Sequence, residues 1–193
     1  MSDIATVLRR ALQPADADPD LPEGTPAAVV VPLLDLDEPT LLFTRRTDLV
    51  RDHKGEISFP GGVRHADDPD LMTTALRETE EELGIGRDAF EIVGALAPVQ
   101  TFVSGYVIAP FVGVLARRPT LRPSPVEIEE VLELGVAGLA SEERKVVPDG
   151  APPGLPPMYV YEMGGQIVWG ATGRIVHGFL EVLREGGWIK KEE

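Results

Sequence analysis

Apolar residues recur along the chain with two spacings, one typical of helices and one typical of strands. Residues 3–12 and 172–184 carry apolar side chains three or four positions apart, as amphipathic helices do. Residues 27–34 form a valine-rich apolar run, and residues 56–59 alternate apolar with polar positions, so both segments are predicted to be strands. The same criteria predict further strands at residues 40–46, 90–97, 106–116, 131–134, 158–163 and 166–169, and a short helix at residues 138–143.

A longer helix is predicted after the pair Gly61-Gly62, which we interpret as a tight turn at the end of a strand. Asp68 is expected to cap this helix, Pro69 suits its first position, and Gly84 ends it. The predicted apolar side of the helix consists of Leu71, Ala75, Leu76, Thr79 and Leu83.

The order of these elements favours mixed sheets packed between helices, because strands outnumber helices and the two long helices lie far apart in the sequence. The fold class is therefore predicted to be α/β in the wider, α+β sense. Pro110 inside the 106–116 strand predicts a sheet edge or a break at that point. A chain of 193 residues can form one domain with a sizeable core, and residues 1–193 are expected to do so.

Composition excludes several kinds of site. The chain has no cysteine, which excludes disulfides, thiolate nucleophiles and zinc–thiolate centres. Its formal charge of −14 argues against nucleic acid as a partner, and no apolar run is long enough for a transmembrane helix. The first residues lack the apolar core and cleavage site of a signal peptide. We therefore expect a cytoplasmic protein with a small-molecule substrate, of an oligomeric state that the sequence does not indicate.

Four glutamates lie within five residues of the predicted long helix, at positions 78, 80, 81 and 82. Glu78 and Glu82 are four residues apart and share one helix face, with Glu81 beside them. Like charges at this spacing repel, and a bound divalent cation would reverse the sign of that interaction. Oxygen-only ligands favour Mg²⁺ or Mn²⁺, which keep coordination positions for water and phosphate oxygens. The alternative interpretation is a solvated acidic helix face.

The residues around these glutamates resemble the signature of the Nudix hydrolase superfamily. Residues 77–85 read R-E-x-x-E-E-x-G-I and follow a Gly-Gly pair and a loop, as in the Nudix box. The chain departs from that pattern in the loop, where the spacing from Gly62 to Arg77 is one residue longer than in the box. It also carries Asp68 near the first acidic position instead of a glutamate, and Thr79 in place of an apolar residue.

A second stretch resembles the coenzyme A diphosphatase (CoA pyrophosphatase) subfamily. Its motif runs from L-L-T-x-R through a further arginine and a glycine to F-P-G-G, and Phe43 and Thr47 are departures from it. The segment Trp169-Gly170-Ala171-Thr172 is similar to a feature at the start of that subfamily's last helix. The matched motif positions are Leu42, Thr44, Arg46, Arg51, Gly55 and the run Phe59-Pro60-Gly61-Gly62.

The resemblance implies an α/β/α sandwich that hydrolyses the diphosphate of coenzyme A to 4′-phosphopantetheine and adenosine 3′,5′-bisphosphate. It makes Glu78 and Glu82 the main ligands of a magnesium or manganese ion, and Glu81 a third ligand or the general base. Arg77 becomes the partner that orients the glutamates, and the carbonyl of Gly61 is a candidate for the metal shell. The implied substrate-binding residues are Arg46, Arg51, Gly61 and Gly62.

The stretch before the box is also the basic part of an acidic chain. Residues 45–64 hold five Lys/Arg and three Asp/Glu, so this stretch is a candidate phosphate-binding surface. The general base stays open between Glu81, Glu56 and an acid from a distant loop, such as Glu142 or Asp149.

Two other functions remain open at this stage. One is hydrolysis of a different nucleoside diphosphate derivative: ADP-ribose, NADH or a dinucleoside polyphosphate. The other is a non-catalytic nucleotide-sensing module on the Nudix scaffold, which is disfavoured because such modules commonly lack the glutamates present at positions 78, 81 and 82. Residues 148–157, rich in proline, are predicted to form a loop and are a candidate lid over the site.

Overall fold

The computed structural model describes residues 3–15, 18–47, 55–101, 104–147 and 156–190. The α-helices in these ranges are α1 (Ile4–Ala11), α2 (Leu71–Leu83), α3 (Val136–Ser141) and α4 (Gly170–Glu185), and a 3₁₀ turn, η1 (Arg87–Ala89), follows α2. The strands are β1 (Thr25–Leu34), β2 (Thr40–Arg46), β3 (Ile57–Ser58), β4 (Gly61–Val63), β5 (Glu91–Ala95), β6 (Val99–Gln100), β7 (Tyr106–Leu115), β8 (Ile128–Gly135), β9 (Arg144–Val146), β10 (Met158–Met163) and β11 (Gln166–Val168).

β1 and β7 form the centre of the large sheet, because both strands are buried over most of their length and are apolar on both faces. They pair in parallel from Thr25 beside Tyr106 to Leu34 beside Leu115. The path across the sheet is β3-β2-β1-β7-β5, and the other pairings in it are antiparallel. The predicted strands at residues 27–34 and 40–46 are present and pair with each other as β1 and β2. The sheet is mixed, as predicted.

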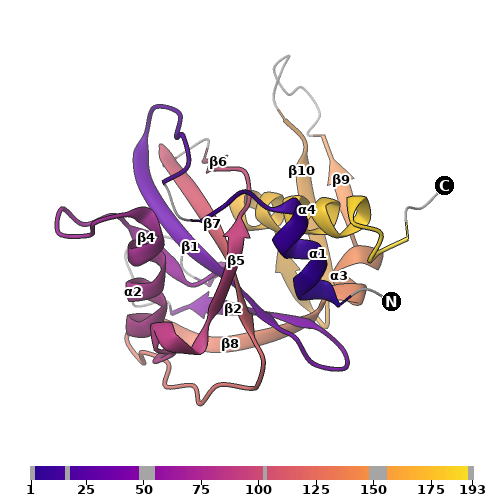
Figure 1. Ribbon diagram of the computed structural model, residues 1–193, viewed down its shortest axis with the longest axis horizontal. Coiled ribbons are helices and arrows are strands. Elements are labelled where there is room, and N and C mark those ends of the chain that lie inside the picture. Colours follow the sequence, from indigo (N-terminus) through magenta and orange to yellow (C-terminus); the bar gives the residue numbers. More distant parts are fainter. Residues whose placement is uncertain (1–2, 16–17, 48–54, 102–103, 148–155, 191–193) are drawn as a thin grey trace.

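Helices cover both faces of this sheet (Figure 1). α2 packs on one face, where its Leu71 and Ala75 belong to the same buried cluster as Val30 of β1. On the other face, α1, α3 and α4 share a second cluster with Val31 of β1 and with the small sheet β11-β10-β9. Successive side chains of β1 thus alternate between two cores. The architecture is the predicted α/β sandwich.

α2 buries the apolar side that its spacing predicted, and it ends at Gly84 in a left-handed backbone conformation. Its start differs from the prediction, because Asp70, not Asp68, caps the helix by accepting a hydrogen bond from the Thr73 N–H at 2.7 Å. Asp68 is buried and instead forms an ion pair with Arg77. The buried residues predicted for the helix are all confirmed: Leu71, Ala75, Leu76, Thr79 and Leu83.

The predicted tight turn at Gly61-Gly62 is wrong, because both residues belong to the short strand β4, antiparallel to β1. Gly61 lies opposite Val29, and a Cβ added to Gly61 would lie 2.2 Å from the carbonyl oxygen of Ala28. Its φ of +153° is also one that other residues rarely adopt. Crowding by the neighbouring strand, not chain reversal, therefore explains this glycine.

Replacing Gly61 with alanine is expected to destabilise the fold by about 3 kcal/mol, because the new Cβ meets backbone atoms of β1 and the backbone is strained. Urea unfolding of both proteins measures this difference. Gly178→Ala on α4 is the matched control, since its added Cβ has no heavy atom within 4 Å, and it should be neutral or slightly stabilising. Equal stability of Gly61→Ala and wild type would refute the crowding.

Pro110 lies in the central strand β7, so the prediction of a sheet edge or a break is wrong. β5 and β6 pair one after the other with the same side of β7, and Pro110 lies between these two pairings. Leu96, in the link between β5 and β6, donates its N–H to the Pro110 carbonyl. The missing N–H of proline therefore falls where the ladder is already interrupted.

The remaining differences concern short segments. β6 and β9 are two and three residues long and were not predicted. The last two predicted strands are present as the antiparallel pair β10–β11, and the final amphipathic helix is confirmed as α4. Of the candidate lid at residues 148–157, positions 148–155 lie outside the described residues. None of the described helices is long and apolar enough to cross a membrane.

Candidate active site

The glycine strand β4 and the glutamate helix α2 are in direct contact. A Cβ added to Gly62 would lie 2.5 Å from the carboxyl carbon of Glu78, so glycine leaves the room that this carboxylate occupies. The N–H of Gly61 donates a hydrogen bond to Oε2 of Glu82 at 3.2 Å. The two glycines therefore allow α2 to place two carboxylates against the sheet.

Glu82 is the buried acid of the site, with only 3% of its surface exposed. Burial is the main cause that raises the pKa of Glu82 to about 7, with repulsion from Glu127 and Glu78 in the same direction. The Gly61 N–H and Arg46, whose Nη1 lies 3.7 Å from Oε1 of Glu82, oppose this rise. A positive charge placed beside Glu82 would favour its ionised form.

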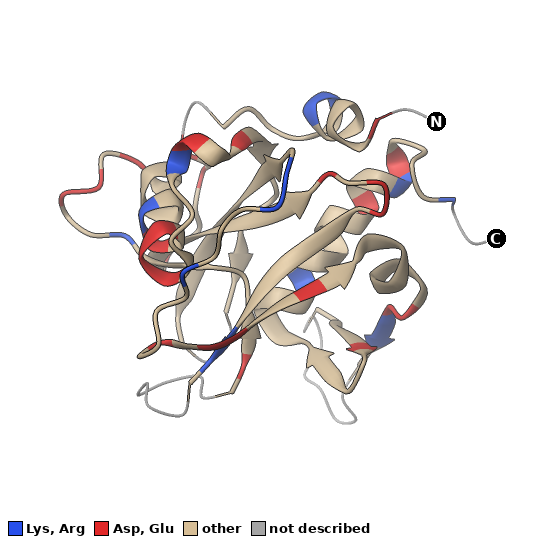
Figure 2. Ribbon diagram, turned by 90° about the horizontal axis from the view of Figure 1, so that it is seen from below, with Lys and Arg blue, Asp and Glu red and all other residues tan. Residues whose placement is uncertain are grey.

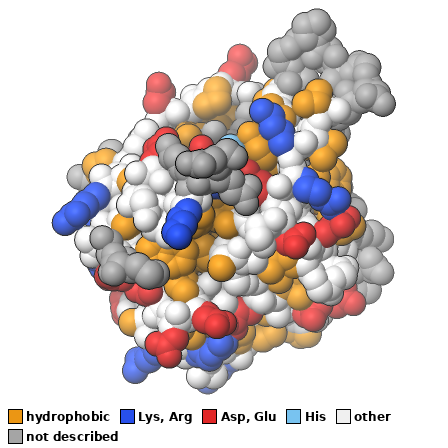
Figure 3. Space-filling view, turned by 90° about the vertical axis from the view of Figure 1, so that its right-hand side faces the viewer, with side chains coloured by type: hydrophobic (Ala, Val, Ile, Leu, Met, Phe, Trp, Pro, Cys, Tyr) orange, Lys and Arg blue, Asp and Glu red, His pale blue; other side chains and the backbone are white. Residues whose placement is uncertain are grey.

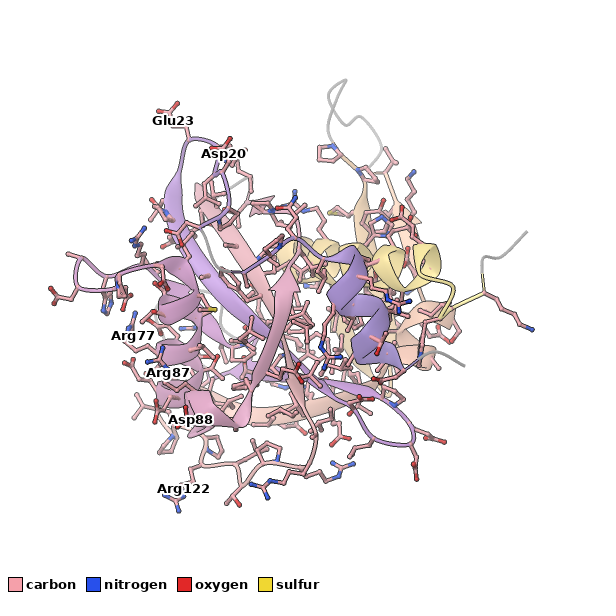
Figure 4. The ribbon with its side chains drawn as sticks, viewed as in Figure 1. Asp20, Glu23, Arg77, Arg87, Asp88 and Arg122 are labelled. Atoms are coloured by element: carbon pink, nitrogen blue, oxygen red, sulfur yellow. The ribbon has the colours of Figure 1, made fainter. Side chains whose placement is uncertain are left out.

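Arg77 binds three carboxylates at once, and Figure 4 labels it beside α2. Its Nη1 donates to Oε1 of Glu78 at 2.8 Å and to Oε1 of Glu81, one helical turn further on, at 3.2 Å. Its Nε and Nη2 donate to Asp68 at 3.0 and 2.9 Å, and these bonds hold the pKa of Asp68 well below its usual range. Arg77 thus fixes the orientation of Glu78 relative to the loop before the helix.

A cavity of about 380 Å³ lies against these glutamates. Its acidic lining comes from Glu56, Glu78, Glu82 and Glu127, and Arg46 is the one cation among the described lining residues. Neutral residues of β1, β4, β7 and the first turn of α4 complete the wall. In Figure 2, several of the Asp and Glu positions marked along the ribbon lie on α2. The cavity therefore joins segments that are far apart in the sequence.

Not every predicted site residue reaches this cavity. Glu81 is 58% exposed and lies outside the lining, although it shares the guanidinium of Arg77 with Glu78. Glu142, at the end of α3, is also outside it. Arg51 and Asp149 lie outside the described residues. The predicted residues that do line the cavity are Arg46, Glu56, Gly61, Gly62, Glu78 and Glu82.

Glu127 is a cavity residue that sequence reasoning missed. It begins an acidic run at the start of β8, and nothing in the local pattern separates it from the solvent-exposed Glu129 and Glu130. Pairing of β8 with β2 brings it to the site, because the Thr47 N–H donates to the Glu127 carbonyl at 2.9 Å and Arg46 lies opposite Ile128. The position of Glu127 in the cavity is therefore determined by the pairing of two strands and not by the local sequence.

Residues of strands β2 and β3 and the segment after β3 support Arg46. The hydroxyl of Thr44 donates to the Ser58 carbonyl at 3.2 Å, which ties β2 to β3. Phe59 stacks on Phe43 with ring centroids 4.6 Å apart. The Nε of Arg46 is buried and has no hydrogen-bond partner among the described residues. An anionic ligand in the cavity would supply an acceptor for such a donor.

The donor set of the cavity suits a hard divalent cation, because carboxylate oxygens are the preferred ligands of Mg²⁺ and Mn²⁺. Within the described part of the chain, however, no three acidic or histidine side chains converge on one point. Arg77 holds Glu78 toward Glu81, whereas Gly61 and Arg46 hold Glu82. Glu78 and Glu82 are thus held by different protein groups, and both could offer carboxylate oxygens to one ion. These oxygens fit Mg²⁺ or Mn²⁺.

The face of the molecule in Figure 3 carries Lys and Arg side chains singly, among acidic and apolar ones. The described side chains of that face form no continuous basic area. The observation agrees with the formal charge of −14.

Comparison with known proteins places the chain in a family. A family model described as the NUDIX domain matches residues 24–149. A relative from Photorhabdus laumondii, called "Uncharacterized Nudix hydrolase NudL", is 35% identical over 152 residues, which are 78% of this chain and 81% of that protein. A MutT/nudix family protein from Enterococcus faecalis has a similar fold, with a TM-score of 0.55 and 15% identity over 86% of this chain and 64% of that one. A MutT protein from Methanosarcina mazei Go1 gives a TM-score of 0.54 and 18% identity over 86% and 96% of the two chains. The chain therefore belongs to the Nudix domain family.

Proposed function

We propose that this protein hydrolyses the diphosphate bond of coenzyme A, or of a derivative, with Mg²⁺ or Mn²⁺ as cofactor. The products are 4′-phosphopantetheine and adenosine 3′,5′-bisphosphate. Membership of the family of Nudix hydrolases supports the reaction class, hydrolysis of a phosphoric anhydride in a nucleoside diphosphate derivative. The substrate rests on the subfamily motif in residues 42–62 and on the 169–172 segment.

One observation carries the substrate proposal. A single cavity is lined by Glu78 and Glu82 of the Nudix box, by Arg46 of the subfamily motif, and by Ala171 and Thr172 of the Trp-Gly-Ala-Thr segment. These three stretches are separated by up to about two thirds of the chain, since Arg46 and Thr172 lie 126 residues apart. Their convergence supports the idea that the motif residues serve one substrate.

Glu78 and Glu82 would hold the metal ion, and Glu56 and Glu127 line the same cavity as further oxygen ligands or bases. The bound ion would neutralise charge on the diphosphate and lower the pKa of a water nucleophile. Arg77 orients Glu78, whereas the Gly61 N–H and Arg46 orient Glu82.

The general base is better sought in the cavity than on the outside of α2. Glu81 is exposed and bound by Arg77, which does not favour it as the group that takes a proton from water. Glu56 and Glu127 line the cavity and are the better candidates among the described residues.

A panel of substrates tests this function. With Mg²⁺ or Mn²⁺ present, coenzyme A is expected to be cleaved with a kcat/KM at least about tenfold above those of ADP-ribose, NADH and a diadenosine polyphosphate, a preference of about 1.4 kcal/mol. Product analysis by mass spectrometry should show 4′-phosphopantetheine. Faster cleavage of ADP-ribose or NADH would exclude the coenzyme A assignment but keep the Nudix chemistry. No turnover of any of them would favour a nucleotide-sensing role.

A further inference from the structure

The first turn of α4 forms part of the cavity wall, through Ala171 and Thr172. Trp169 precedes the helix in an extended conformation, and its side chain makes no capping hydrogen bond. The amides of a first helical turn have no partner within the helix. Here the residue that would normally satisfy them with a side-chain oxygen is a tryptophan. The first turn of α4 therefore presents unsatisfied donors beside the cavity.

Thr172 provides a second, independent observation. The residue as a whole is only 9% exposed, and its hydroxyl, which is not itself buried, has no hydrogen-bond partner among the described residues. A hydroxyl that faces a cavity and makes no hydrogen bond to the protein can bond to water or to a ligand there. Thr172 lines the cavity, so such a ligand would lie in the same space as the substrate.

The charges of the cavity say what kind of ligand this turn would bind. Four carboxylates line the cavity against one guanidinium, that of Arg46, among the residues described. A diphosphate would be repelled by this lining unless positive groups hold its oxygens. The N-terminus of a helix carries a partial positive charge and exposed N–H donors, which favour a phosphate.

We propose that the backbone amides of residues 170–172 and the hydroxyl of Thr172 form a phosphate-binding subsite. The proposal rests on the function proposed above and assigns the first turn of α4 a phosphate of the same substrate. Together with Arg46 and the metal ion, this turn would offset the repulsion between the diphosphate and the glutamates. The bound group is either one phosphate of the diphosphate or the additional 3′-phosphate of coenzyme A.

Titration of the whole protein with inorganic pyrophosphate, after saturation with Mg²⁺, tests the subsite directly. Amide resonances of residues 170–172 are expected to shift in ¹H–¹⁵N spectra on addition of pyrophosphate but not of Mg²⁺ alone. Thr172→Val should weaken pyrophosphate binding about tenfold, the share of one hydrogen bond to a charged group. Thr172→Ser keeps the hydroxyl and should bind within about twofold of wild type.

Thr6→Val, in the first turn of α1 and outside the cavity lining, is the matched control and should leave binding unchanged. Amide shifts confined to β4 and α2 would overturn the proposal, as would equal affinity of Thr172→Val and wild type. If Thr172→Val does not fold, the amide shifts of the wild-type protein alone decide. This binding experiment needs no turnover, so it stands even if coenzyme A proves not to be the substrate.

Kinetics then identify the phosphate. The KM of Thr172→Val is measured for coenzyme A and for its analogue without the 3′-phosphate. A similar rise of KM for both molecules shows that one of the two phosphates of the diphosphate binds at α4. A rise for coenzyme A alone places the 3′-phosphate there. An unchanged KM for both molecules, with coenzyme A turned over by wild type, contradicts the subsite.

Discussion

Glu82→Gln is expected to abolish hydrolysis, with kcat below about a thousandth of the wild-type value. Glutamine keeps the shape of the side chain but carries no charge, so it is a far weaker ligand for a divalent cation than the buried carboxylate. Steady-state kinetics with coenzyme A and Mg²⁺ measure the loss. Glu80→Gln is the matched control, because Glu80 is exposed on the same helix and lies outside the cavity lining. Unchanged turnover in Glu82→Gln would remove Glu82 from the metal site.

The same substitution should stabilise the metal-free fold at high pH. The pKa of Glu82 is raised from 4.5 to about 7, so the folded state binds this proton more tightly than the unfolded chain. The stability that this protonation contributes is complete below about pH 4.5 and is lost as the pH rises through 7. Glutamine avoids that loss, which amounts to about 3 kcal/mol above pH 8.

Urea unfolding in EDTA at pH 5 and pH 8.5 separates these regimes. Glu82→Gln and wild type should have similar stability at pH 5, whereas the variant should be more stable at pH 8.5. Adding Mg²⁺ should raise the stability of the wild type only, because a ligand stabilises the state that binds it. A lower stability of Glu82→Gln at pH 8.5 would show that burial does not strain this carboxylate. Opposite effects on activity and stability are typical of a residue kept for function.

The parts of the fold that sequence predicted well are those whose pattern is decided by burial. β1, β7 and α4 bury long apolar segments, and the spacing of their side chains follows directly from the faces they cover. The spacing of Glu78 and Glu82 likewise placed two acids at one cavity. Local geometry on a single element was sufficient in each of these cases.

The parts that sequence predicted poorly depend on contacts between elements. Glu127 reaches the cavity because β8 pairs with β2, whereas Glu81 is exposed on α2, where it contacts Arg77, and lies outside the cavity lining. Pro110 is tolerated in a central strand because two short strands share its neighbouring edge. Asp68 has the sequence context of a helix cap and was assigned that role, although its partner lies nine residues further along the chain.

That partner makes Asp68→Asn the second substitution with a large expected effect. Asp68 is 7% exposed and accepts hydrogen bonds from Arg77, from the Thr74 hydroxyl and from the His65 N–H. Removing its charge leaves Arg77 without a full counter-charge in a partly buried site, at a cost of about 3 kcal/mol at pH 7. Because Arg77 also binds Glu78, kcat should fall as well.

The pH dependence distinguishes the ion pair from a general packing defect. The pKa of Asp68 is lowered from 3.8, so its contribution to stability is present above about pH 4 and is lost as the pH falls below that value. The difference between wild type and Asp68→Asn in urea unfolding should therefore be constant from pH 8 to pH 5 and should shrink toward pH 3. Asp67→Asn, at the exposed neighbouring position, should match wild type throughout. A difference that persists undiminished at pH 3 would mean that Asp68 acts through its shape and not through its charge, and that Arg77 needs no counter-charge to hold Glu78.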